Sequence, residues 1–208
     1  GLDSIPGVTR LSISVDAIGY ASQEFDIGYR EADWNSGTRY ELNVVAHMES
    51  GRVQPNGGFY VFFEERDWQG QTFLGTQERA NLDCWGFGLQ GGATLHLIEP
   101  GKPLGLALVP YGRGGLGFQD FSAEDVVIDN ARYDLSSDSG RLELGAGLDL
   151  RLNVAQRLEV VFGGGVTYWS AADVALYAGT GGGGVAVGSN GTFTGTDAWL
   201  RFGLGLSF

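Results

Sequence analysis

The sequence lacks several features that would place the chain in a common class. It has one cysteine, Cys84, so it can form neither an internal disulfide nor a cysteine-based metal site. It has one lysine, Lys102, and only 13 basic residues against 25 acidic ones. This balance argues against a nucleic-acid partner, because phosphate backbones are bound by clustered Lys and Arg. No apolar run of about 18 residues is present that could cross a bilayer as a helix.

The composition is that of one folded domain. The hydrophobic fraction of 43%, with five Trp, eight Tyr and twelve Phe, is too high for a disordered acidic chain. The 36 glycines follow no three-residue period, which excludes collagen. We therefore expect a single domain over 1–208. The chain begins at Gly1 with no basic start and no apolar segment after it, so we expect that a signal peptide has been removed.

Eight segments show a strict two-residue alternation of apolar with small or polar residues. Such alternation is typical of β-strands that have two different faces. The segment around 59–66 is apolar on both faces, and we place Phe59, Val61 and Phe63 on the apolar one. The apolar faces of the eight segments begin at Leu11, Tyr40, Phe59, Trp85, Leu104, Leu142, Leu158 and Ala198.

The connections between these segments alternate in length. Short links rich in Gly, Pro and Asn lie at 50–58, 99–102 and 153–157. Long polar stretches lie at 22–39, 65–82, 117–140 and 170–196. This pattern predicts an up-and-down barrel with short turns at one end and four long loops at the other.

The barrel could be a soluble cup with an apolar interior or a membrane barrel with an apolar exterior. The less apolar face decides, because it consists of Gly, Ala, Ser and Thr with isolated Arg, Glu and Asp, which suit the narrow lumen of eight strands. Tyr40, Trp85 and Tyr168 lie at the loop ends of their strands on the apolar face, where interfacial aromatic residues belong. We therefore predict an all-β fold, a closed antiparallel transmembrane β-barrel of eight strands.

The C-terminus carries a family resemblance. Arg201, Gly203, Leu206 and the terminal Phe208 resemble the C-terminal signal of bacterial outer-membrane barrels. The whole chain resembles the small eight-stranded proteins of the OmpA transmembrane-domain and OmpX type. This resemblance implies a Gram-negative outer membrane, insertion by the barrel-assembly machinery, and surroundings of lipid bilayer and lipopolysaccharide. It also implies that residues 1–7 and the short turns are periplasmic and that the four long loops are extracellular.

Charged residues on the lumen face predict an ion-pair network. If Leu152 and Leu158 are cross-strand neighbours, Arg151 lies directly opposite Glu159. Buried charges must be paired, so the network would close the narrow lumen to solutes; the alternative is a charged permeation path. The other lumen charges of this prediction are Arg141, Glu143, Asp149, Arg201, Asp16, Arg113 and Glu41.

The remaining candidates for chemistry are weak. His47 and His96 face the lumen near the short-turn end, where we expect hydrogen-bonding roles, and no Ser on the lipid-facing surface is placed for activation by either. The acidic residues Asp120, Glu124, Asp125 and Asp129 could bind divalent cations, but their spacing is not that of a calcium loop. We expect no catalytic residues, no resident metal and no cofactor.

These observations predict a non-enzymatic barrel with a plugged lumen. As the family resemblance implies, it would act in surface structure or in adhesion and partner binding through its extracellular loops. Two alternatives remain open, a lipid A-modifying enzyme and a narrow solute channel. A protein partner at the loops, or a place in a larger envelope complex, is also compatible with the sequence.

Overall fold

The computed structural model describes residues 8–26, 31–33, 36–48, 52–71, 77–98, 104–128, 131–154, 157–178 and 185–208. Its strands are β1 (Val8–Asp26), β2 (Glu31–Asp33), β3 (Ser36–Met48), β4 (Val53–Gln71), β5 (Gln77–Ile98), β6 (Leu104–Ile128), β7 (Ala131–Val154), β8 (Leu158–Ala178) and β9 (Val185–Ser207). No helix in this part of the chain is long and apolar enough to cross a membrane.

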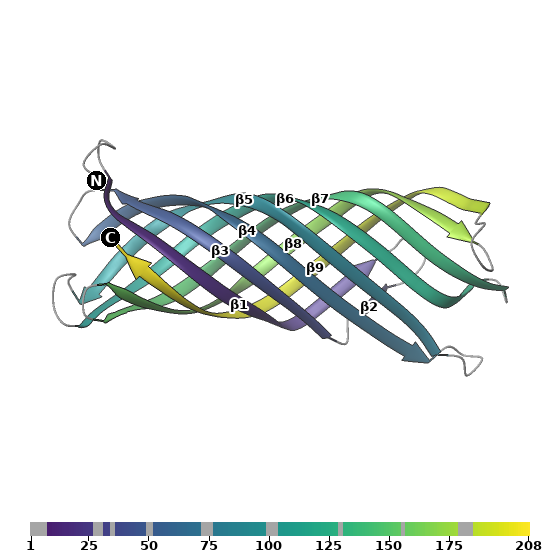
Figure 1. Ribbon diagram of the computed structural model, residues 1–208, viewed down its shortest axis with the longest axis horizontal. Coiled ribbons are helices and arrows are strands. Elements are labelled where there is room, and N and C mark those ends of the chain that lie inside the picture. Colours follow the sequence, from purple (N-terminus) through teal and green to yellow (C-terminus); the bar gives the residue numbers. More distant parts are fainter. Residues whose placement is uncertain are drawn as a thin grey trace.

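The eight long strands form a closed antiparallel barrel, as the alternation predicts (Figure 1). Each long strand pairs with the next along the chain, and β1 closes the barrel by pairing with β9. The start of β1 and the end of β9 lie together at one end of the barrel (Figure 1), where Leu11 and Phe208 exchange backbone hydrogen bonds of 3.1 and 2.9 Å. We call this end, which also joins β3–β4, β5–β6 and β7–β8, the short-turn end, and the opposite end the loop end.

The strands extend much further toward the loop end than the sequence predicts. Most residues of the polar stretches at 65–82, 117–140 and 170–196 belong to strands, and the stretch at 22–39 holds the end of β1 and the start of β3 with the three-residue β2 between them. The prediction of four long loops at these boundaries is therefore wrong. Only 27–30, 34–35, 72–76, 129–130 and 179–184 lie between the described strands at this end.

The physical reason is an inversion of polarity along the barrel. From the short-turn end up to the aromatic residues Tyr40, Phe63, Trp85 and Phe118, the outer face is apolar, and these four are consecutive cross-strand partners. We call these four residues the girdle. Beyond the girdle the outer face is polar, and the inner face becomes apolar after a layer of charged residues that includes Glu64 and Arg66. The two-residue alternation continues past the girdle, but its apolar residues now lie on the other face. A sequence interpretation that follows one apolar face along a strand therefore ends the strand at the girdle. The buried apolar residues beyond the girdle are Trp68, Ala80, Leu82, Phe121, Ala123, Trp169, Ala171 and Phe193.

The register of β4 confirms the placement of Phe59, Val61 and Phe63 on the outer face, where their exposed fractions are 46, 45 and 50%. Their neighbours Tyr60 and Phe62 are buried in the lumen. A two-residue period makes this choice decisive, because a shift of one residue would exchange the two faces.

Candidate functional site

The lumen toward the loop end contains a balanced cluster of charges. Four arginines, Arg39, Arg66, Arg113 and Arg141, contact the four carboxylates of Glu41, Glu64, Glu143 and Asp197. All eight side chains are at most 3% exposed. We call this set the loop-end cluster.

Arg39 is the centre of the loop-end cluster. Its guanidinium donates to Glu143 at 2.7 and 2.8 Å, to Glu41 at 2.7 Å and to Glu64 at 3.2 Å. Its planar group also lies over the ring of Phe62, 3.7 Å from the centroid. Arg66 similarly donates to both oxygens of Asp197 at 2.7 and 2.6 Å. Forked donor geometry of this kind is specific to arginine, which explains why lysine does not occur in the cluster.

A second balanced cluster fills the lumen toward the short-turn end. Arg10 and Arg151 both contact Glu159, at 2.7 and 2.9 Å. Arg201 contacts Asp149 and also Asp16, the latter at 3.3 Å. Arg151 joins the two groups through Asp149 at 3.4 Å. We call these three arginines and three carboxylates the short-turn cluster.

All nine sequence-predicted lumen charges lie in these two clusters. The predicted pair Arg151 and Glu159 does meet, but not as direct cross-strand partners. Leu158 pairs with Val154 rather than Leu152, so Glu159 lies opposite Asn153 and reaches Arg151 diagonally. The predicted register was therefore wrong by two residues. A register shift of two residues keeps every side chain on its face of the sheet. Arg151 and Glu159 therefore both face the lumen and still make contact.

Five members of the clusters were missed by the sequence reasoning: Arg10, Arg39, Glu64, Arg66 and Asp197. Arg39 and Arg66 fell in stretches interpreted as loops, and Asp197 directly follows such a stretch. Glu64 could have been found, because it has the same parity as the lumen-facing neighbours of Phe59, Val61 and Phe63.

An aromatic layer covers the loop-end cluster. Phe193 packs edge-on against Phe121 and Trp169, each with a centroid separation of 5.0 Å. Trp169 also donates to Asp197 at 3.0 Å, and Arg141 lies 4.6 Å over its ring. The layer therefore packs directly on the ion pairs. Between the two clusters, Ile18, Tyr111 and Trp199 form a further buried apolar group.

The two histidines make hydrogen bonds at the short-turn end. His47 is 1% exposed, with Nε2 lying 3.1 Å from Ser12 Oγ and Nδ1 3.1 Å from Thr94 Oγ1. His96 Nε2 lies 3.0 Å from Gln54 Oε1. A serine therefore does contact a histidine, but inside the lumen rather than on the lipid-facing surface. The orienting partner of His47 is a hydroxyl rather than a carboxylate.

The outer face presents the predicted aromatic residues. Tyr40, Trp85 and Tyr168 are 54, 57 and 51% exposed and point away from the lumen. Of the four residues assigned to the C-terminal signal, Leu206 and Phe208 are exposed, whereas Arg201 belongs to the short-turn cluster. A Cβ at Gly203 would overlap the carboxylate of Asp16, so this glycine leaves space for the lumen charge.

The predicted acidic residues are only partly described. Asp120 and Glu124 lie exposed on the outer face of β6. The side chain of Asp125 and the whole of Asp129 lie outside the described residues, as do residues 1–7. Within the described ranges no group of three His, Cys, Asp or Glu side chains could hold a metal ion.

The net charge of the chain is concentrated at the loop end. Both lumen clusters are balanced, so the formal charge of −12 comes from residues outside them. The charges of the residues that precede β1 or connect strands at the short-turn end also sum to zero. The remaining excess of acidic residues therefore belongs to the loop end. The cancelling residues are Asp3, Glu49, Glu99, Arg52, Lys102 and Arg157.

No protein-family model and no curated protein matches the sequence. Among solved structures, the chain is similar to a major outer membrane protein from Thermus thermophilus, with 16% identity, coverage of 95% of this chain and 99% of that chain, and a TM-score of 0.53. It is also similar to Ail, the attachment invasion locus protein of Yersinia pestis, with 16% identity, coverage of 98 and 100%, and a TM-score of 0.41. The likeness to the Thermus thermophilus protein, at 16% identity, concerns the fold, which is that of a bacterial outer-membrane β-barrel.

Proposed function

We propose that this chain is an integral outer-membrane barrel with a sealed lumen, acting at the cell surface through its loop end. Its role there is surface structure or adhesion and the binding of a partner. The observation that carries the proposal is the filling of the lumen by two neutral ion-pair clusters and an aromatic layer. A solute would have to separate these ion pairs, and a charge left unpaired in a dry interior is costly.

Membrane insertion is supported by the outer face. Leu89, Leu144 and Phe202 are 71, 56 and 52% exposed, and similar residues surround the barrel from the girdle to the short-turn end. A soluble monomer rarely exposes an apolar surface of this extent. We call this exposed apolar surface between the girdle and the short-turn end the apolar belt, and we propose that lipid bilayer and lipopolysaccharide surround it.

The membrane proposal predicts a folded barrel that is recovered in detergent micelles. Unheated samples should migrate differently from boiled ones on a denaturing gel, because closed barrels resist unfolding by detergent. Recovery of the folded chain as a monomer in buffer without detergent would contradict the proposal.

The surface role requires that the loop end faces outward. A cysteine placed at Ser136, exposed on β7 near the loop end, should react with a membrane-impermeant maleimide on intact cells, whereas one at Arg157 should react only after lysis. The natural Cys84 is buried and gives the background. Attachment of cells that produce the protein, compared at equal assembly with cells that do not, then measures adhesion. The reverse labelling pattern would overturn the proposed orientation.

We also propose that the chain is not an enzyme. The serine and histidine in contact, Ser12 and His47, are 3 and 1% exposed and lie within the ion-pair network. Ser12→Ala should therefore leave the fatty-acid composition of outer-membrane lipids unchanged when wild type and variant are produced at equal levels. Acyl-chain release by the wild type that Ser12→Ala abolishes would establish the enzymatic alternative.

A further inference from the structure

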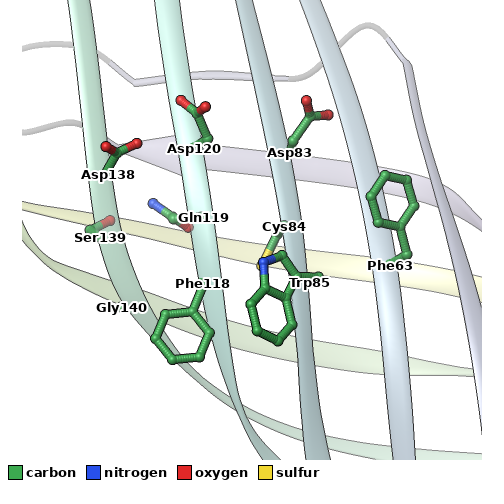
Figure 2. Close-up of a pocket in the computed structure, with 10 residues that line it drawn as sticks. All are labelled: Phe63, Asp83, Cys84, Trp85, Phe118, Gln119, Asp120, Asp138, Ser139 and Gly140. Carbon is green, nitrogen blue, oxygen red and sulfur yellow. The ribbon is translucent and has the colours of Figure 1, made fainter.

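An outer-face cavity of about 450 Å³ lies across β5, β6 and β7 just beyond the girdle (Figure 2). Its polar side is formed by Asp83, Asp120 and Asp138, and its apolar side by Trp85 and Phe118. Figure 2 shows the three carboxylates on one side of the cavity and the two aromatic rings on the other. The cavity is therefore amphipathic and lies where the apolar belt meets the polar outer face.

The three aspartates form a like-charge row. Asp120 is the direct cross-strand partner of both Asp83 and Asp138. All three are exposed, and none has an ion pair or a side-chain hydrogen bond within the described part of the chain. Like charges directly opposite each other destabilise a sheet. The row thus carries a cost that a bound cation would relieve.

The apolar side has an open notch. The rings of Trp85 and Phe118 lie 5.0 Å apart between centroids, and both are more than half exposed. The next cross-strand partner of Phe118 is Gly140, where an added Cβ would meet nothing within 4 Å. The girdle therefore stops at Gly140 and leaves space for an apolar group from outside the chain.

A buried residue lies behind the cavity. Gln119 is 3% exposed, and neither its Nε2 nor its Oε1 has a hydrogen-bond partner among the described residues. In Figure 2 this amide extends from β6 toward Ser139, its cross-strand partner. A buried amide without a partner is unfavourable, but Gln119 alternates with the outward-pointing Phe118 and Asp120 and therefore faces the lumen, so the polar contacts that the cavity offers from outside are those of the three aspartates.

The chemistry of this lining selects an organic cation rather than a metal ion. The carboxylates lie in a spread row, and no described group of three acidic side chains could hold a metal. An ammonium group can make charge-assisted hydrogen bonds to several carboxylates. Its adjacent carbon groups can pack on aromatic rings, where cation–π attraction also contributes.

We propose that this cavity binds a membrane lipid that carries a primary amine in its head group. The ammonium lies along Asp83, Asp120 and Asp138, and the apolar part descends past Trp85 and Phe118 at the Gly140 notch. This inference rests on the proposed membrane function, because it needs the girdle to lie at the lipid boundary. The site would then hold an amine-bearing lipid against the wall of β5, β6 and β7.

The test uses the full chain purified in detergent and native mass spectrometry. An equimolar mixture of short-chain phosphatidylethanolamine and phosphatidylglycerol is added, and the lipid retained by the protein is measured. The wild type should prefer phosphatidylethanolamine. Asp120→Asn should reduce its retention by about tenfold, the effect of one charge-assisted hydrogen bond on an equilibrium constant. Gly140→Leu should also reduce it, by filling the notch without a backbone clash.

Glu124→Gln is the matched control, because Glu124 is an exposed acidic residue of β6 that does not line the cavity. It should leave the preference unchanged. Equal retention of both lipids by the wild type, an equal loss in the control, or competition by free ethanolamine at the same concentration would each overturn the inference. If the wild type shows no difference in gel migration between heated and unheated samples, the proposed membrane function is contradicted. The lipid-retention results bear only on the cavity, so the failures of the two proposals are distinguishable.

Discussion

At the residue scale, each lumen charge has a partner of opposite sign, and glycines make space for these partners. Glu159 shows the first point, because it accepts hydrogen bonds from Arg10, Arg151 and Ser12 at 2.7, 2.9 and 3.2 Å. Gly203 shows the second, because any side chain there would displace Asp16 from Arg201. The ion pairs therefore depend on small residues as much as on charged ones.

Removing one member of an ion pair should cost more than removing two. Glu159→Gln leaves Arg151 and Arg10 without their shared carboxylate, and we expect a loss of about 3–5 kcal/mol in the free energy of unfolding. The double change Arg151→Met with Glu159→Leu should cost less, because Arg10 is 18% exposed and can turn toward solvent. Urea unfolding in detergent measures both. An equal or larger loss in the double variant would refute this explanation of the short-turn cluster.

Two glycines of the same barrel should respond differently to alanine. Gly203→Ala forces Asp16 to move and should destabilise the protein by about 1–3 kcal/mol, as overpacking does. Gly19→Ala meets nothing within 4 Å and should have almost no effect. The same unfolding measurement compares them, and equal effects would show that space for Asp16 is not what Gly203 provides.

At the element scale, the sequence predicts strands well where one face meets lipid and poorly beyond it. The segments around Leu11, Leu142 and Leu158 are strands with the expected faces, because apolar residues there recur on one side only. Toward the loop end, the outer face changes to Asp83 and Asp120 while the inner face changes to Leu82 and Phe121. The two-residue alternation continues, but the apolar residues move from the outer face to the inner face. These strand ends are therefore easily mistaken for loops.

The reversed part of the barrel should have a conventional buried core. Phe121→Ala removes a ring that is 1% exposed and packs on Phe193, and it should cost about 3–5 kcal/mol. Ser122→Ala, one residue further on the outer face, should be nearly neutral. Thermal unfolding in detergent would compare the two. A neutral Phe121→Ala would mean that the stretch 117–140 behaves as the loop that its polarity suggests.

The last strand should carry an assembly signal in addition to its structural role. Deleting Phe208 should reduce insertion into the outer membrane without reducing synthesis, because the terminal aromatic is 58% exposed and available for recognition. Phe208→Tyr, which keeps an aromatic terminus, is the control and should insert normally. Cell fractionation with the heat-shift gel gives the inserted fraction. Normal insertion of the chain that lacks Phe208 would contradict the prediction of a C-terminal assembly signal.

At the scale of the whole molecule, the barrel separates its charges into a neutral interior and an acidic loop end. The sequence predicts the closed barrel and most lumen charges, since both depend on a two-residue period. It could not predict which carboxylate each arginine meets, because Arg39 of β3 binds Glu143 of β7 across the lumen. Nor could it predict the outer-face cavity, which needs the register of three strands at once.

The central claim is that the lumen is sealed, and single-channel recording in a planar bilayer tests it most directly. The purified wild-type protein, shown to be folded by its gel shift, should produce no stable conductance steps in a salt solution at which a reference porin conducts. The ion pairs of both clusters and the aromatic layer over Asp197 would then be an intact barrier. Steady, reproducible conductance steps from the folded wild-type monomer would contradict the account and establish the channel alternative.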